Sequence, residues 1–126
     1  MPHISVDYSA NLESELDIPA LCDVLRRAAI ETGIFPVAGV RVRAFAATHV
    51  SIADGDTKHG YIDFAVRLRG GRDLADRQKA TQSIFAAARA FVAPLMATRS
   101  LALSMEMRNI DPELAPKTGT IADHVT

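Results

Sequence analysis

The stretch YIDFAVRLRGGRD, residues 61–73, decides the fold of this chain. Its first nine residues alternate in polarity, which is typical of a strand that buries one face. The apolar side chains that share the inner face are Ile62, Phe64, Val66 and Leu68. The Gly70-Gly71 pair then forms a tight passage, and Asp73 is placed to cap a following helix. The stretch therefore predicts a strand that leads almost directly into a helix.

Downstream of residue 73 the pattern changes to helical spacing. The apolar stripe of this helix consists of Ile84, Phe85, Ala88, Phe91 and Leu95. Pro94 lacks an N–H group, so it must kink or finish the helix. Alternation returns over residues 101–108, which predicts another strand. A strand, helix and strand joined this closely predict a parallel pair with a right-handed crossover.

The N-terminal half has the same order of elements. Residues 2–8 alternate as a strand, and Asp17 can cap a helix that ends where Gly33 takes a left-handed conformation. A second strand starts near Gly39. The prediction is an α+β fold of two tandem βαβ units, with a four-stranded mixed sheet and both helices on one face. We expect residues 1–126 to form one domain, in which residues 108–126 are a tail packed on a neighbouring subunit.

Composition excludes several classes of function. The 126 residues carry 14 basic and 15 acidic groups, with 48% apolar and 23% charged residues. This balance is ordinary for a globular domain, and it gives no support to nucleic-acid or membrane binding. The N-terminus lacks the pattern of a secretory signal, so we expect a cytoplasmic protein.

Cysteine and histidine usage gives no metal site. Cys22 is the single cysteine, which excludes an internal disulfide and zinc clusters built on cysteine. The Asp54-Gly55-Asp56 segment with His49 and His59 suits a turn better than a metal site, because its spacing differs from that of a calcium loop. We therefore expect no metal.

Two helices can cover only one face of the sheet. The face left uncovered carries charges of both signs, which has two interpretations: a solvated face, or a face buried against other subunits with its charges paired. A closed ring of subunits would also protect the sheet edges. The residues assigned to this face are His3, Ser5, Asp7, Arg41, Arg43, Phe45, Asp63, Arg67, Arg69, Ser104, Glu106 and Arg108.

Three residues are candidates for chemistry. Removal of Met1 would expose the secondary amine of Pro2, and a neutral amine of this kind is a competent general base. Arg41 opens the second strand, and Arg72 precedes a helix N-terminus, where free N–H groups favour an anion. These two arginines indicate an anionic ligand, most simply a carboxylate.

Four segments resemble the 5-carboxymethyl-2-hydroxymuconate isomerase family of the tautomerase superfamily. They are Pro2-His3, TGIFPVAGVR at 32–41, GGRDL at 70–74 and LALSME at 101–106. The resemblance spans nearly the whole chain. It implies a trimeric, tautomerase-like enzyme of homoprotocatechuate catabolism, which uses an N-terminal proline and no cofactor.

The resemblance also implies a role for each candidate. Pro2 matches the catalytic proline, Arg41 the arginine of the Ala-Gly-x-Arg motif, and Arg72 an arginine that holds a substrate carboxylate. The implied reaction converts an enol to a ketone in 5-carboxymethyl-2-hydroxymuconate or a similar carboxylated dienol. Alternatives are a tautomerase of another enol acid and a non-catalytic trimer that binds carboxylates. Alternation places Arg41 on the face opposite Ile4, so whether Pro2 and Arg41 meet within one chain stays open.

Overall fold

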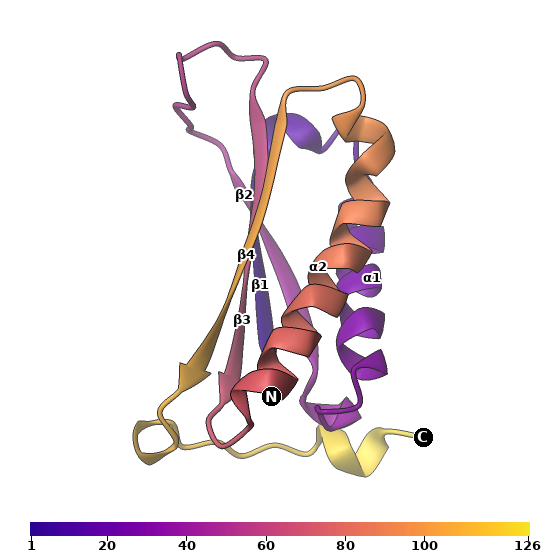
Figure 1. Cartoon of the computed structure of the whole chain (residues 1–126), viewed down its shortest axis with the longest axis vertical. Coiled ribbons are helices and arrows are strands. Elements are labelled where there is room, and N and C mark those ends of the chain that lie inside the picture. Colours follow the sequence, from indigo (N-terminus) through magenta and orange to yellow (C-terminus); the bar gives the residue numbers. More distant parts are fainter.

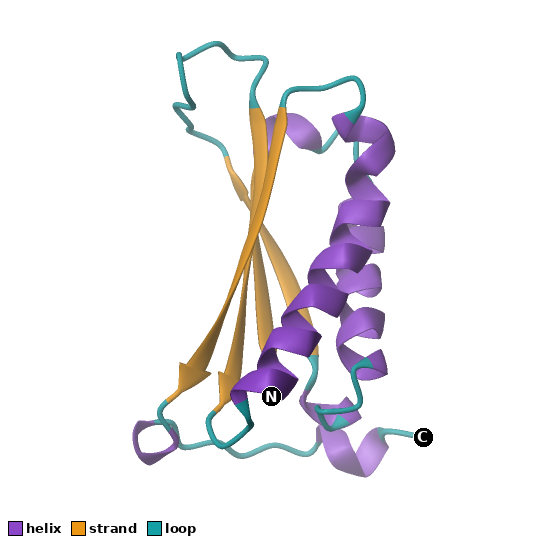
Figure 2. Cartoon of the chain, in the orientation of Figure 1, coloured by secondary structure: helices purple, strands orange, loops and turns teal.

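The computed structural model describes residues 1–126. Four strands and two helices follow in the predicted order: β1 His3–Ser9, α1 Ile18–Glu31, β2 Arg41–Ala47, β3 Gly60–Arg69, α2 Leu74–Met96 and β4 Leu101–Ile110. Short 3-10 turns are η1 Ala10–Leu12, η2 Val37–Gly39, η3 Pro112–Leu114 and η4 Ile121–His124. Both helices lie on the same side of the sheet, as Figures 1 and 2 show, so the molecule has two layers.

The sheet topology confirms the two tandem βαβ units. Its strand order is β2-β1-β3-β4. Each unit contributes a parallel pair, β1 with β2 and β3 with β4, while β1 and β3 are antiparallel. The sheet is therefore mixed. The two first strands meet at its centre, and β2 and β4 are its edges.

The core lies between the sheet and the helices because every second strand residue points toward them. The central strands β1 and β3 supply much of it, since each has a neighbouring strand on both sides. Phe64 is 1% exposed, so its truncation to alanine would cost about 3–5 kcal/mol. The buried side chains are Ile4, Val6 and Tyr8 of β1, Ile62, Phe64, Val66 and Leu68 of β3, Leu21, Leu25 and Ala29 of α1, and Ile84, Ala88 and Val92 of α2.

The ends of α1 agree with the sequence in detail. The Asp17 side chain accepts a hydrogen bond from the Ala20 backbone N–H at 3.0 Å, and Pro19 lies in the first turn, where no N–H is needed. Gly33 has a φ of 75°, a left-handed conformation that suits glycine. These local signals confirm where α1 begins and ends.

The ends of α2 agree in part. Asp73 is the cap residue, but its side chain makes no capping hydrogen bond, so that part of the prediction is wrong. Pro94 lies within the last turn, and the helix ends at Met96. Pro94 has no N–H to donate to the Ala90 carbonyl four residues earlier, and the helix ends two residues after it, as the sequence predicts.

The C-terminal strand is longer than predicted. β4 continues to Ile110, whose carbonyl accepts a hydrogen bond from the Gly70 backbone N–H at 3.4 Å, so the tail begins at residue 111. Pairing with β3 holds these last two residues in the sheet, although their own side chains do not alternate cleanly. The tail then runs across the lower end of the sheet in Figure 1 (yellow). Its packing on a neighbouring subunit stays a prediction.

The loop at residues 48–59 lies at the opposite end of the sheet and is tied to the fold by His59. Its imidazole lies 2.7 Å from the carboxylate of Asp54 and 2.7 Å from the hydroxyl of Ser100. Asp54 also accepts the backbone N–H of Asp56 at 3.0 Å, as in an Asx turn. The aspartates therefore build the turn, as expected.

Candidate active site

Pairing between β1 and β2 positions the N-terminus. The Arg41 backbone N–H donates a hydrogen bond to the carbonyl of Pro2 at 3.2 Å, and His3 lies opposite Arg41 in the parallel register. The Pro2 side chain is fully buried. Pro2 and Arg41 are thus neighbours within one chain, at the end of the sheet where β1 and β2 begin.

Position 39 requires a glycine because its backbone lies against the N-terminal residue. A Cβ atom on Gly39 would lie 2.1 Å from the Met1 nitrogen and 3.2 Å from the Met1 Cα. Any larger residue would therefore collide with the N-terminal residue. The Ala-Gly-x-Arg segment brings its backbone against the N-terminus, and Arg41 follows two residues later in the lining of the same cavity.

A cavity of about 850 Å³ opens at this end of the molecule. Its lining combines the N-terminus, the η2 turn, strand residues and the tail. The lining residues are Met1, His3, Pro36, Ala38, Gly39, Arg41, Arg67, Ile110, Leu114–Gly119, Ile121 and Ala122. Arg41, Arg67 and Lys117 are cationic, and the lining contains no aspartate or glutamate. The cavity therefore favours an anion.

The same positive field acts on the N-terminal amine and on His3. Burial lowers the pKa of the N-terminal amine below its usual value, and the charges of Lys117, Arg41, Arg72 and Arg69 lower it further. Burial likewise lowers the pKa of His3, with Arg41, Arg67 and Arg43 adding to the effect. A neutral amine beside fixed cations can accept a proton while an anion is bound.

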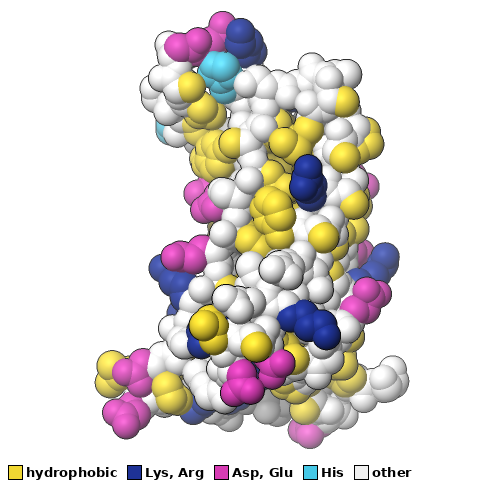
Figure 3. Space-filling view, viewed as in Figure 1, with side chains coloured by type: hydrophobic (Ala, Val, Ile, Leu, Met, Phe, Trp, Pro, Cys, Tyr) yellow, Lys and Arg dark blue, Asp and Glu magenta, His cyan; other side chains and the backbone are white.

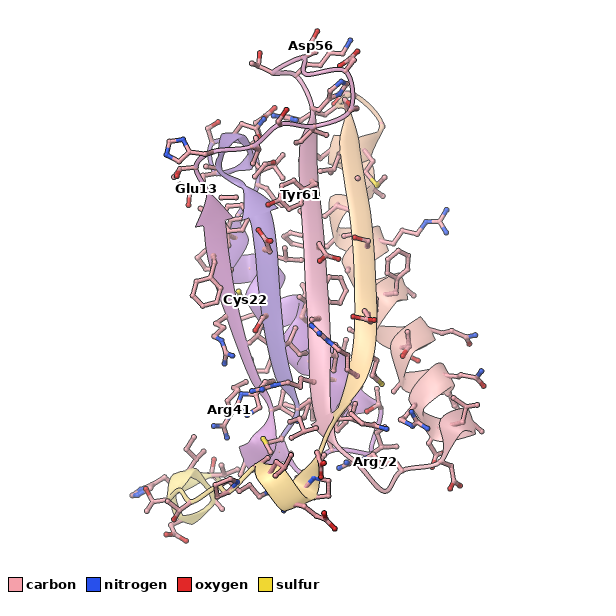
Figure 4. The ribbon with its side chains drawn as sticks, turned by 90° about the vertical axis from the view of Figure 1, so that its left-hand side faces the viewer. Glu13, Cys22, Arg41, Asp56, Tyr61 and Arg72 are labelled. Atoms are coloured by element: carbon pink, nitrogen blue, oxygen red, sulfur yellow. The ribbon has the colours of Figure 1, made fainter.

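Arg72 lies at the same end of the sheet as Arg41, as the side chains in Figure 4 show, but outside the cavity lining. Its Nε donates to the Ile34 carbonyl and its Nη1 to the Arg69 carbonyl, each at 3.0 Å. The guanidinium also lies over the Phe35 ring, 5.2 Å from its centroid. Arg72 therefore holds the loop before η2 against the end of β3, and its Nη2 keeps no hydrogen-bond partner in the chain.

Two cations of the cavity were not singled out by the sequence. Alternation places Arg67 only on the uncovered face, and its approach to the N-terminus depends on the antiparallel register that places it opposite His3. Lys117 lies in the tail, which has no periodicity from which a position could be predicted. No group of three or more histidine, cysteine, aspartate or glutamate side chains is arranged to hold a metal ion.

Comparison with known proteins decides the family. A family model for 5-carboxymethyl-2-hydroxymuconate isomerase matches residues 2–125. The 5-carboxymethyl-2-hydroxymuconate Delta-isomerase of Escherichia coli is 34% identical over 121 residues, which cover 96% of each chain. The chain belongs to the 5-carboxymethyl-2-hydroxymuconate isomerase family. Family membership confirms the resemblance described above and makes the chain an isomerase.

Solved structures agree with this family. A crystal structure of a 5-carboxymethyl-2-hydroxymuconate delta-isomerase has a TM-score of 0.90 at 31% identity, covering 98% of this chain and 92% of that chain. The isomerase of Deinococcus radiodurans R1 has a TM-score of 0.91 at 26% identity, covering 99% and 95%. A fused 4-OT protein has a TM-score of 0.67 at 15% identity over 88% of each chain, which shows the shared fold alone.

Proposed function

We propose that this isomerase converts 5-carboxymethyl-2-hydroxymuconate, or a closely similar carboxylated dienol, from its enol to its keto form. The observation that carries the proposal is the cavity, because it joins the N-terminus to three cations and contains no acidic side chain. Such a cavity attracts a small polycarboxylate and repels cationic competitors, while a neutral molecule gains nothing from its charge. The reaction would belong to the breakdown of an aromatic acid.

Pro2 is the proposed base. While Met1 is attached, the Pro2 nitrogen is an amide and cannot accept a proton. Removal of Met1 would leave a secondary amine in the cationic surroundings that lower the pKa of the present N-terminus. The neutral amine would take the proton from the 2-hydroxyl group and return a proton at a distant carbon. The proton is conserved, so the step needs no cofactor.

Arg41 is the proposed partner of the developing negative charge. As the 2-hydroxyl loses its proton, charge grows on that oxygen beside the adjoining carboxylate. A guanidinium can bind both oxygens with a planar pair of donors, and the hydrogen bond between the Arg41 and Pro2 backbones keeps the start of β2 beside the N-terminus. Preorganised charge of this kind is usually the largest contribution to catalysis.

Arg72 is proposed to bind the carboxylate at the far end of the dienol chain. Its Nε and Nη1 are occupied by backbone carbonyls, which keep the guanidinium in one orientation. The unpartnered Nη2 would then be available to the substrate. This arrangement combines a structural role for Arg72 with a binding role.

We also propose that the chain assembles as a homotrimer. The outer edges of β2 and β4 have no strand partner in the chain, and β4 presents half-exposed Leu101, Leu103, Met105 and Met107. Figure 3 shows apolar side chains gathered between β4 and α2. On the uncovered face Phe45 is 58% exposed, and Leu114 of the tail is 80% exposed. Closed association would cover these edges and apolar groups.

The decisive experiment combines the intact mass with turnover. We expect the purified protein to lack Met1 and to convert the dienol, followed by loss of the absorbance of its conjugated system. Pro2→Ala keeps an N-terminal amine but loses the ring, so activity should fall without disappearing. Arg89→Ala, at an exposed position of α2 outside the cavity, should leave the rate unchanged. Full activity in protein that retains Met1 would exclude Pro2 as the base.

The same assay separates the alternatives. Faster conversion of a different enol acid across a substrate panel would favour another tautomerase activity. Binding of carboxylates by processed protein that converts no dienol would favour the non-catalytic trimer.

A further inference from the structure

The C-terminal tail forms one wall of the cavity. After β4 ends at Ile110, the chain crosses the end of the sheet, and η4 contacts η2, the turn that contains Gly39. Residues 114–119 and residues 121–122 line the cavity on this side. Lys117 is the only cation among them. The tail therefore brings a positive charge from the end of the chain to the N-terminus.

The cations of the cavity come from three separate segments and have no acidic partner. Arg41 begins β2, Arg67 lies near the end of β3, and Lys117 is in the tail. The chain forms five ion pairs, at Arg26, Lys58, His59, Arg99 and Arg108, and none involves these three residues. Three unpaired cations around one cavity would repel one another, and a bound polyanion would remove that repulsion.

The carboxylates of the proposed substrate can be compared one by one with the cations at the cavity. 5-Carboxymethyl-2-hydroxymuconate carries three carboxylates: one beside the 2-hydroxyl, one at the far end of the dienol chain, and one on the carboxymethyl branch. The proposed function assigns the first two to Arg41 and to Arg72, which lies beside the cavity lining rather than in it. Arg67 and Lys117 are left, and both line the cavity.

We propose that Arg67 and Lys117 bind the carboxylate of the carboxymethyl branch, so that the tail selects substrates that carry this third carboxylate. The identity of the substrate rests on the proposed function, whereas the preference for a third carboxylate rests on the cations that line the cavity. An ammonium group and a guanidinium group both form charge-assisted hydrogen bonds with carboxylates. Lys117 is thus a specificity-determining residue at the end of the chain.

The test compares two dienols that differ only in the branch. The wild-type protein should prefer 5-carboxymethyl-2-hydroxymuconate over 2-hydroxymuconate in kcat/KM. Lys117→Met and Arg67→Met should each reduce that preference about tenfold or more, as expected for loss of a hydrogen bond to a charged group. The activity toward 2-hydroxymuconate should change little, because that substrate lacks the branch.

Two matched variants control for the loss of a charge elsewhere. Lys79→Met and Arg89→Met, both on α2, remove the same residue types from exposed positions outside the cavity. Both should keep the wild-type preference. If Lys117→Met slows both dienols equally, the tail has no selective role and the proposal is wrong.

A binding measurement keeps this inference separate from the proposed function. Tricarballylate and glutarate are unreactive acids with three and two carboxylates, and calorimetry gives their affinities for the processed protein. Tighter binding of tricarballylate that is lost in Lys117→Met supports the inference even if neither dienol is converted, which would overturn only the proposed function. Equal affinities for the two acids, or a preference unchanged in Lys117→Met, would overturn the inference.

Discussion

Replacement of Arg41 by alanine tests the proposed mechanism most directly. The substitution removes the cation next to the N-terminus but keeps the backbone N–H that bonds to Pro2. Arg41 is exposed, so its loss leaves the core unchanged. Arg67 and Lys117 remain in the cavity to attract the substrate. The effect should therefore fall on the chemical step more than on binding.

The expected magnitude follows from this arrangement. Loss of one donor that stabilises a developing oxyanion costs about 10²–10³ in kcat, whereas two remaining cations should keep the rise in KM below about tenfold. The Arg41 charge is also among the causes of the lowered pKa of the N-terminal amine. Because a nearby cation disfavours the charged amine, its removal raises that pKa.

The pH dependence has a definite sign. Catalysis requires the neutral amine, so kcat/KM should rise as pH increases through the amine pKa of the free enzyme and then become constant. In Arg41→Ala this rise should move to higher pH. Steady-state rates over a range of pH measure both effects, and Arg41→Lys should lie between the wild type and Arg41→Ala because it keeps the charge but loses the planar fork. An unchanged kcat together with an unchanged pH profile would refute the role assigned to Arg41.

Four further outcomes are expected. Gly39→Ala places a methyl group where Met1 stands before processing, so in the processed chain it should block the approach to Pro2 and lower kcat/KM at least tenfold, with an unchanged circular dichroism spectrum. Arg72→Ala should raise KM more than it lowers kcat, and denaturant unfolding should show a loss of about 1–3 kcal/mol because two backbone carbonyls lose their donor. Light scattering at micromolar concentration should give the mass of three subunits, and Phe45→Glu should shift it toward the mass of a single subunit. A monomeric wild-type protein would exclude the trimer. The pKa of the Asp54 carboxyl is lowered, mainly because it accepts the backbone N–H of Asp56. The stability that Asp54 adds to the loop at residues 48–59 is therefore complete above the usual carboxyl pKa and is lost as pH falls through the lowered pKa. Limited proteolysis of this loop should become faster over that fall in pH.

The order of strands and helices follows from local patterns in the sequence. Alternation at residues 61–69 and the helical stripe after residue 73 depend only on near neighbours in the chain, and the structure confirms both. The caps of α1 are equally local, since Asp17 and Gly33 act within one turn. The Asp73 prediction is wrong in part: the residue occupies the cap position, but its side chain accepts no hydrogen bond from the first turn of α2.

The candidate site is predicted less completely. Pro2 and Arg41 stand out from residue type and position, and the structure places their backbones in hydrogen-bond contact. Their roles stay proposals. Arg72 stands out for the same reason, but its fork contacts two backbone carbonyls and lies outside the cavity lining, which no sequence pattern indicates.

By itself, the sequence determines the two βαβ units, the face that each strand buries, and the family resemblance. The tertiary structure alone decides which distant residues share the cavity. Arg67 reaches the N-terminus because β1 and β3 pair antiparallel in one particular register, and Lys117 reaches it because the tail crosses the end of the sheet. The physical reason is that periodicity reports contacts a few residues apart, whereas the β1–β3 pairing and the docking of the tail depend on contacts between segments more than fifty residues apart.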